Sequence, residues 1–180
     1  MNFKEFYNGK RVLVTGADGF IGSHLTERLI DYGAQVIVFV KDNTLLHGSN
    51  LPKLNNITHL KDKLKILSGN ISSYDFVNLI RKERPEIIFH LAADAYVNKS
   101  FMQPREVIQT NVDGTLNVLH SCLNEEMKPA EFIKRIVVTS SSEVYGTYDI
   151  PIKEDFELKP SSPYGASKAA ADRLSYSYYN

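Results

Sequence analysis

The sequence predicts an α/β fold, a doubly wound parallel sheet covered by helices on both faces. Short apolar runs rich in β-branched residues alternate with amphipathic stretches, a pattern typical of strands that are buried on both faces and joined by helical crossovers. A glycine-rich turn joins the first apolar run to the first amphipathic stretch. The 180 residues are 43% hydrophobic and 23% charged, which is ordinary globular composition and argues against disorder. We therefore expect one domain over residues 1–180.

Five apolar runs are predicted as strands, and four stretches with helical spacing as helices. The strands are expected at residues 11–15, 35–40, 64–68, 86–91 and 135–140. The helices are expected at residues 21–32, 73–84, about 104–125, and from 164 to the end of the chain. Gly33 and Pro85 end the first two helices, because glycine adopts the left-handed cap conformation and proline cannot continue a helix. Residues 41–63 are polar, so we expect an irregular connection there, with at most a short helix.

Charge and composition exclude several classes of protein. The 21 basic and 21 acidic residues balance, which argues against binding to nucleic acid or a membrane surface through bulk electrostatics. Cys122 is the single cysteine and the histidines share no ligand spacing, so we expect neither a disulfide nor a metal site. No apolar run approaches the roughly 20 residues of a membrane span, and the first residues contain no hydrophobic signal-peptide core. A cytoplasmic protein is the expectation.

The turn after the first strand predicts a phosphate-binding site. Residues 16–22 read GADGFIG. Gly16 allows a tight turn, Gly19 lets the backbone approach a pyrophosphate, and Gly22 lets the helix pack closely. The N–H groups and positive dipole end of the following helix would then face the phosphates. A dinucleotide is therefore expected at the carboxyl ends of the strands, and a glycine turn without a ligand is the alternative.

The end of the second strand bears on which dinucleotide binds. Val40 stands where this type of fold places a carboxylate for the ribose 2′-hydroxyl of NAD, and valine is apolar. Lys41 follows and could pair with the 2′-phosphate of NADP, while Asp42 could still reach the ribose. These residues favour NADP over NAD. A solvated surface lysine is the alternative interpretation of Lys41.

Two segments near the end of the chain predict redox chemistry at an alcohol. Tyr164 and Lys168 form a YxxxK motif on the last predicted helix, where one turn puts both on one face. A neighbouring ammonium and the positive nicotinamide ring help a tyrosine to act as a base near neutral pH. Ser141 follows the fifth strand, and its hydroxyl could hydrogen-bond the reacting oxygen.

These motifs, in this order, resemble the extended short-chain dehydrogenase/reductase family, the nucleotide-sugar epimerases and dehydratases. The resemblance runs from about Lys10 to the last residue and includes HLAA at 90–93, TNVDGT at 110–115 and SPYGASK at 162–168. It implies a Rossmann-like fold, a nucleotide-sugar substrate, and a homodimer formed through the long helix and the YxxxK helix. It implies Ser141, Tyr164 and Lys168 as the catalytic triad. The cofactor-binding residues that it implies are Gly16, Asp18, Gly19, Phe20, Ile21, Gly22, Val40, Lys41, Asn70, Ile71, Leu91, Ala92, Ala93, Asn111, Tyr164 and Lys168.

Within the family, Glu143 favours a dehydratase. The 4,6-dehydratases carry a glutamate at this position, which removes the C5 proton after oxidation at C4. Ser142 precedes it where dTDP-glucose dehydratases have an aspartate, which is closer to the Thr-Ser-Glu of GDP-mannose and UDP-N-acetylglucosamine 4,6-dehydratases. UDP-glucuronate decarboxylases share that sequence. We therefore predict a nucleotide-sugar 4,6-dehydratase, with a 4-epimerase, a UDP-glucuronate decarboxylase, or a non-catalytic dinucleotide-binding module or inactive fragment as alternatives.

Two departures from the family pattern stand out. Asn70 replaces the aspartate that usually contacts the adenine amino group. The family continues into further strands and a substrate-binding lobe beyond the position of Asn180. The resemblance therefore implies a fold that is incomplete at the C-terminus. The residues that select the sugar and the nucleotide of the substrate are expected in the further lobe, so residues 1–180 do not indicate either.

Overall fold

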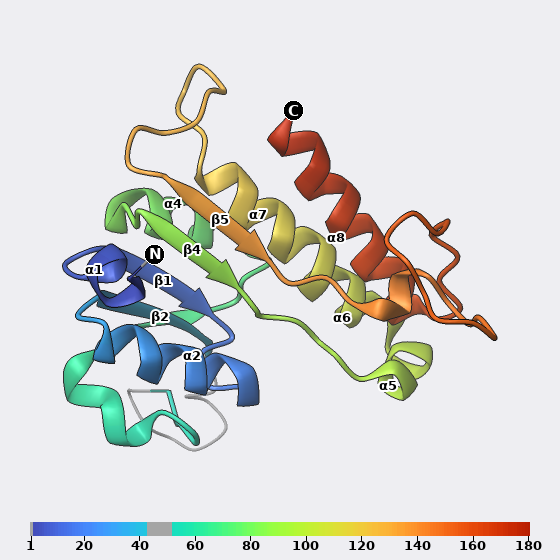
Figure 1. Cartoon of the computed structure of the whole chain (residues 1–180), viewed down its shortest axis with the longest axis horizontal. Coiled ribbons are helices and arrows are strands. Elements are labelled where there is room, and N and C mark those ends of the chain that lie inside the picture. The colour runs from blue at the N-terminus through green and yellow to red at the C-terminus, as the bar shows by residue number, and fades with distance from the viewer. Residues whose placement is uncertain (1, 43–51) are drawn as a thin grey trace.

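The computed structural model describes residues 2–42 and 52–180, and it contains the expected doubly wound α/β architecture (Figure 1). Five parallel strands form one sheet in the order β3-β2-β1-β4-β5. The strands are β1 (Arg11–Thr15), β2 (Gln35–Lys41), β3 (Lys65–Gly69), β4 (Ile87–His90) and β5 (Arg135–Val138). All five predicted strands are present, and the prediction of a parallel Rossmann-like sheet is confirmed.

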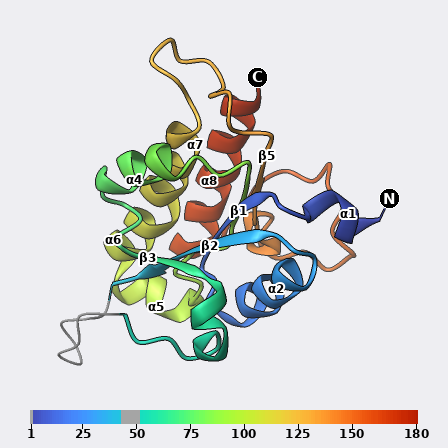
Figure 2. The ribbon, with the colours of Figure 1, turned by 90° about the vertical axis from the view of Figure 1, so that its left-hand side faces the viewer.

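Helices cover both faces of the sheet (Figures 1 and 2). On one face lie α1 (Phe3–Tyr7), α2 (Phe20–Asp31) and the 3₁₀ helix η1 (Thr58–Lys63). The other face packs against α4 (Asp75–Glu83) and α7 (Gly114–Ser121). Alternation along β1 divides the core, since Val12 and Val14 face the first layer and Leu13 faces the second. All three side chains are fully buried.

The remaining helices lie beside the second layer, where β4 and β5 end. They are α5 (Val97–Met102), α6 (Pro104–Ile108), the π-helical segment η2 (Gln109–Asp113), the 3₁₀ turn η3 (Ser142–Val144) and α8 (Pro163–Tyr179). Helix α8 packs against α6, η2 and α7, and Figure 1 shows it running alongside α7. This arrangement brings the YxxxK motif to the carboxyl ends of the last two strands.

The helices differ from the sequence prediction at α1, at α5 and over residues 104–125. Helices α1 and α5 were not predicted. The helix expected over about 104–125 is instead α6, η2 and α7 in succession, and it ends at Ser121. The Asn124 side chain accepts the N–H groups of Glu126 and Lys128, each at 3.0 Å, so a turn built on asparagine replaces the expected last helical turn. The irregular connection expected over 41–63 includes residues 43–51, which lie outside the described residues.

The sheet edge at β5 is only partly covered. Alternate residues of this strand are exposed, and the Val137 side chain is 38% exposed.

Within residues 2–42 and 52–180, no helix combines the length and apolar character that a membrane crossing requires.

Candidate active site

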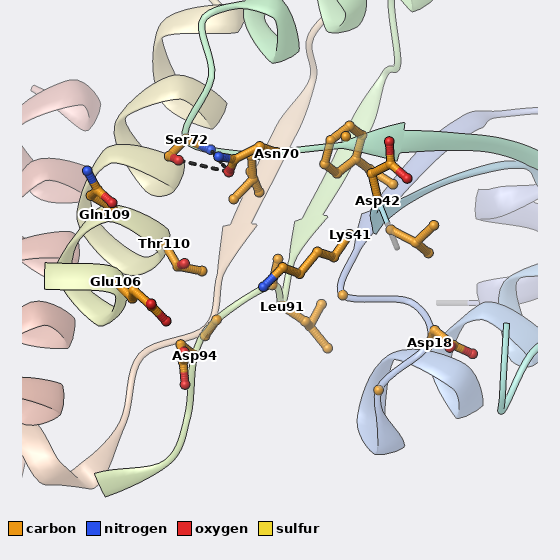
Figure 3. A pocket seen from close by; sticks show the side chains of 18 residues that line it. Asp18, Lys41, Asp42, Asn70, Ser72, Leu91, Asp94, Glu106, Gln109 and Thr110 are labelled. Carbon is orange, nitrogen blue, oxygen red and sulfur yellow. Dashed lines mark hydrogen bonds between the residues drawn. The ribbon is translucent and has the colours of Figure 1, made fainter. Parts of the chain in front are cut away.

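A cavity of about 620 Å³ lies at the carboxyl edge of the sheet (Figure 3). Its walls come from the glycine turn after β1, the ends of β2 and β3, the segment after β4, and α6 with η2. The predicted cofactor residues that line it are Gly16, Asp18, Gly19, Val40, Lys41, Asn70, Ile71, Leu91, Ala92 and Ala93. The volume lies within the range of small-molecule and cofactor sites.

The cavity also has lining residues that the sequence reasoning did not name. They are Phe39, Gly69, Ser72, Asp94, Glu106, Gln109 and Thr110. Most of them adjoin a predicted residue in the sequence. Asp42, which the sequence offered as a possible contact of the ribose, lines the cavity as well. Glu106, Gln109 and Thr110 come from α6 and η2, a stretch in which the family resemblance implied only Asn111 as a cofactor-binding residue. The predicted cofactor residues Phe20 and Ile21 are 79% and 66% exposed on the first turn of α2, outside the cavity lining.

Glycine is required at two positions of the turn for packing within the protein. Gly16 has a φ of +71°, and a Cβ there would lie 2.7 Å from the Ala92 nitrogen and 2.8 Å from the Leu91 carbonyl carbon. A Cβ on Gly22 would clash with the carbonyl oxygen of Gly16. A Cβ on Gly19 meets only that same oxygen, at 3.2 Å. The turn is therefore held closely against the segment after β4, and it opens toward the cavity at Gly19.

The carboxylate of Asp18 binds the protein's own backbone. It accepts the N–H groups of Asn55 at 2.9 Å, Asn56 at 2.7 Å and Ile57 at 3.2 Å. The Asn56 side-chain amide donates in return to the Asp18 carbonyl oxygen at 2.7 Å. Charge-assisted hydrogen bonds of this kind are stronger than neutral ones. Asp18 therefore ties the segment before η1 to the glycine turn, and its predicted role in cofactor binding stays a prediction.

His90, at the end of β4, is buried between two threonines. Its Nδ1 lies 2.8 Å from Thr15 Oγ1, and its Nε2 lies 3.0 Å from Thr115 Oγ1. Thr115 Oγ1 donates to the Asn111 carbonyl at 2.6 Å, so it accepts from His90 Nε2–H. Thr15 Oγ1 accepts the N–H of Ala92 at 3.2 Å and can donate its own proton to Nδ1. One tautomer satisfies the whole chain of hydrogen bonds.

His90 is neutral in this environment. Burial and, to a smaller extent, the positive charge of Lys168 lower the pKa of His90 from 6.5 to about 3. The histidine therefore acts as a structural link. It connects β1 to the Ala92 segment, which lines the cavity, and to the π-helical segment.

Asn111 in the π-helical segment η2 joins the segment after β4 to the YxxxK helix. Its Oδ1 accepts the N–H of Asp94 at 2.8 Å, and its Nδ2 donates to the Asp94 carbonyl at 3.1 Å and to Ser167 Oγ at 2.9 Å. Ser167 Oγ donates to the Tyr164 carbonyl at 2.7 Å. Asn111 is 1% exposed and lies outside the cavity lining. It positions elements that surround the predicted site, and π-helical segments often occur at functional sites.

Helix α8 begins with a capped turn that carries Tyr164. Ser162 is the N-cap, and its Oγ accepts the N–H of Gly165 at 3.0 Å. Lys168 is 5% exposed, and its Nζ donates to the Thr139 carbonyl at 2.5 Å. Burial lowers the pKa of Lys168 from its ordinary value. The ammonium thus ties α8 to the segment that follows β5.

The segment with Ser141 and Glu143 packs against the first turn of α8. Ser141 caps η3, and its Oγ accepts the N–H of Glu143 at 3.2 Å. A Cβ on Gly165 would lie 2.6 Å from the Glu143 carbonyl oxygen, so the two backbones are in close contact. The segments that carry the four predicted catalytic residues therefore lie together where β5 ends and α8 begins, and the catalytic roles of these residues stay a prediction. Ser141 also lines a second cavity of about 490 Å³, which is bounded on its other sides by Glu154, Phe156, Leu158, Asp172 and Arg173.

Charged side chains line the main cavity on two sides. Figure 3 shows the Lys41 side chain extending into the cavity from the end of β2. Asp42 lines the same wall. Lys99 pairs with the Asp94 carboxylate, which raises the pKa of Lys99, and lies 3.6 Å from a Glu106 oxygen. In the described ranges, no group of three or more His, Cys, Asp or Glu side chains could hold a metal ion.

The parallel sheet, the glycine turn and the YxxxK helix together are typical of the extended short-chain dehydrogenase/reductase type of fold. The family model described as GDP-mannose 4,6 dehydratase matches residues 13–180, so the chain belongs to this family of nucleotide-sugar dehydratases and epimerases. The resemblance predicted from the sequence is thereby confirmed.

Known relatives include both kinds of enzyme at similar identity. A trifunctional UDP-glucose 4,6-dehydratase of Arabidopsis thaliana is 37% identical over 177 residues, which are 96% of this chain and 25% of that protein. A UDP-glucose 4-epimerase of Mycolicibacterium smegmatis is 36% identical over 172 residues, which are 94% of this chain and 51% of that protein. The solved structure of MoeE5 with UDP-glucose and NAD is 34% identical, with a TM-score of 0.72, and the match covers 93% of this chain and 48% of that one. The chain thus spans between a quarter and half of the length of these relatives.

Proposed function

We propose that residues 1–180 form the NAD(P)-binding domain of a nucleotide-sugar 4,6-dehydratase and carry its catalytic residues. The observation that carries this proposal is the close packing of the Ser141–Glu143 segment on the first turn of the YxxxK helix. A second base beside the tyrosine is what elimination across C5 and C6 requires, whereas epimerisation at C4 alone does not need it. The cavity beside the glycine turn supports the dinucleotide part of the proposal.

The proposed chemistry assigns one task to each residue. Bound NAD(P) would accept a hydride from C4 of the sugar and return one to C6. Tyr164 takes the proton of the C4 hydroxyl, while Ser141 hydrogen-bonds the same oxygen and Lys168 supplies a positive charge close by. The resulting C4 carbonyl acidifies the C5–H bond, and Glu143 removes that proton. The C6 hydroxyl then leaves as water with a proton from Glu143 or from an ordered water, and C5 takes up one proton from Glu143 or from solvent when the hydride returns to C6.

For the cofactor, we propose the main cavity as the binding site. The N–H groups at the start of α2 would meet the pyrophosphate, and the residues at the ends of β2 and β3 would meet the adenosine. The MoeE5 structure contains NAD, so the relatives give no support to the NADP preference predicted from Lys41. NAD is therefore the first cofactor to test. NADP remains the alternative that the Lys41 ammonium would favour.

We also propose a homodimer formed through α6, α7 and α8. Apolar side chains are exposed along these helices: Ile108 is 44% exposed, Leu116 37%, Tyr176 59% and Tyr179 87%. A second copy of the chain would cover them in a bundle of helices. Analytical ultracentrifugation of the wild type and of a Leu116→Glu variant tests this proposal, since a charge in the bundle should shift the dimer toward monomer. A wild-type chain that stays monomeric at high concentration would contradict it.

The experiment for the reaction is mass spectrometry of GDP-, UDP-, CDP- and dTDP-sugars incubated with the protein and NAD or NADP. Loss of one water from a sugar nucleotide supports a dehydratase. An unchanged mass with a new epimer supports the 4-epimerase, and loss of carbon dioxide supports the decarboxylase. Tyr164→Phe should abolish every turnover, because it removes the base for the first step. Glu143→Gln should block loss of water while oxidation at C4 persists; an unaffected dehydration rate in this variant refutes the assignment.

A further inference from the structure

The strand order determines which wall of the main cavity faces the purine base. The pyrophosphate of a dinucleotide belongs at the glycine turn after β1, and the adjoining ribose belongs at the end of β2. The base continues in the same direction, and the next strand in the sheet is β3. The last residue of β3 and the three residues after it, 69–72, line the cavity. The opposite direction along the sheet leads to β4, β5 and α8, where the nicotinamide end of the dinucleotide belongs.

Asn70 presents hydrogen-bond donors on this wall. Its Oδ1 accepts both the N–H of Ser72 at 3.0 Å and the Ser72 hydroxyl at 2.8 Å, as Figure 3 shows for the hydroxyl. The side-chain oxygen is thus occupied within the turn, and the rest of the polar end is an amide group that can only donate. Among the described residues, this amide group has no hydrogen-bond partner.

The orientation of the Asn70 amide is set by the turn. If the amide were flipped, its nitrogen would face the N–H of Ser72, so two donors would meet and the backbone N–H would lose its acceptor. Asparagine stabilises such turns by accepting the N–H two residues later. The turn is also anchored from outside, because Asn117 Nδ2 donates to the Ile71 carbonyl at 2.9 Å and to the Ser73 carbonyl at 3.2 Å.

Purine bases differ in what they offer to such a donor. Adenine carries an amino group at C6, which needs an acceptor, whereas hypoxanthine and guanine carry an oxygen there, which needs a donor. An amide that only donates can pair with a ring nitrogen of adenine or with the C6 oxygen of a 6-oxopurine. It therefore gives adenine no advantage. A carboxylate at position 70 could fill the same turn with one oxygen and accept the adenine amino group with the other.

We infer that Asn70 is the specificity-determining residue for the base, and that it lets the site take 6-oxopurine dinucleotides as well as adenine dinucleotides. This inference rests on the proposed dinucleotide function. The relevant ligand class is a pyridine dinucleotide whose purine carries an oxygen at C6. The preference for one purine over the other is measured as the ratio of the dissociation constants of the two dinucleotides. A substitution that weakens the binding of both equally leaves this ratio unchanged.

The test measures the dissociation constants of NAD and nicotinamide hypoxanthine dinucleotide by isothermal titration calorimetry. The wild type should bind the two within about threefold of each other. Asn70→Asp should shift the ratio at least about tenfold toward NAD, as expected for one charge-assisted hydrogen bond gained and one oxygen repelled. Asn78→Asp makes the same change of charge on an exposed residue of α4 outside the cavity lining, and it should leave the ratio unchanged.

Other results would contradict either the role of Asn70 or the proposed function. A wild type that prefers NAD tenfold or more, or an Asn70→Asp variant whose ratio is unchanged, overturns the role of Asn70 while the dinucleotide site stands. A shift of the same size in Asn78→Asp assigns the effect to net charge and overturns it too. If the wild type binds neither dinucleotide, the proposed function fails, and this inference fails with it.

Discussion

Replacement of His90 by glutamine should remove a pH dependence from the stability of the fold. Glutamine can keep the hydrogen bond at the Nε2 position, because its side-chain nitrogen can donate to Thr115 Oγ1 there. It carries no titratable proton. The variant therefore separates the titration of His90 from its link to Thr115.

The size of the effect follows from the pKa of His90. In the unfolded chain the pKa is the ordinary 6.5, and in the folded protein burial lowers the pKa to about 3. Between these values the unfolded state binds the extra proton, so the free energy of unfolding falls as the pH falls, by about 1.4 kcal/mol per pH unit. At pH 5 the loss is about 2 kcal/mol relative to neutral pH. Any folded-state pKa below about 4 gives nearly the same result.

The assay is urea denaturation followed by circular dichroism at pH 7 and pH 5. The free energy of unfolding of the wild type should fall by about 2 kcal/mol more than that of His90→Gln. His59→Gln is the matched control, since the His59 side chain is 58% exposed and lies 2.8 Å from a Glu27 oxygen; it should retain most of the wild-type pH dependence. If the wild type and His90→Gln lose equal stability between these pH values, the account of a neutral, buried His90 is refuted.

Three further substitutions have expected outcomes. Gly22→Ala should unfold the glycine turn or abolish dinucleotide binding, because its Cβ would clash with the Gly16 carbonyl oxygen; thermal unfolding with and without NAD measures this. Asp18→Ala should destabilise the fold by about 1–3 kcal/mol, because three backbone N–H groups at residues 55–57 lose their acceptor; urea denaturation is the check, and an unchanged midpoint would contradict it. Ser162→Ala should lower the free energy of unfolding by about 1 kcal/mol through loss of the α8 cap. An unchanged free energy of unfolding would contradict a stabilising role of this cap.

The sheet was predictable because its strands are short apolar runs. Residues 11–15 and 35–41 are buried over most of their length, so their sequence is nearly continuous in β-branched and aromatic residues. Helix α1 was not predicted because it has five residues and none of them is buried. The division of the helix expected over about 104–125 was missed because the π-helical segment depends on hydrogen bonds of Asn111 to distant residues. Periodicity alone does not reveal such contacts.

The site was predictable in its composition and less so in its hydrogen bonds. The glycine turn, the ends of β2 and β3 and the segment after β4 meet at one cavity because parallel strands end at one edge of the sheet. The partners of the Asp18 carboxylate lie 37 to 39 residues away in the sequence, so their approach depends on how η1 packs on the first layer. The buried state of His90 likewise depends on Thr115, which α7 brings into place.

The central claim is that the cavity at the carboxyl edge of the sheet binds a pyridine dinucleotide. The most direct test is a titration of the isotopically labelled chain with NAD, followed through its backbone amide resonances. The account predicts saturable shifts for residues 16–19, 69–72 and 91–94, which line three walls of the cavity. The claim is contradicted if NAD leaves these resonances unchanged, or if the shifts are confined to residues 140–145 beside the second cavity.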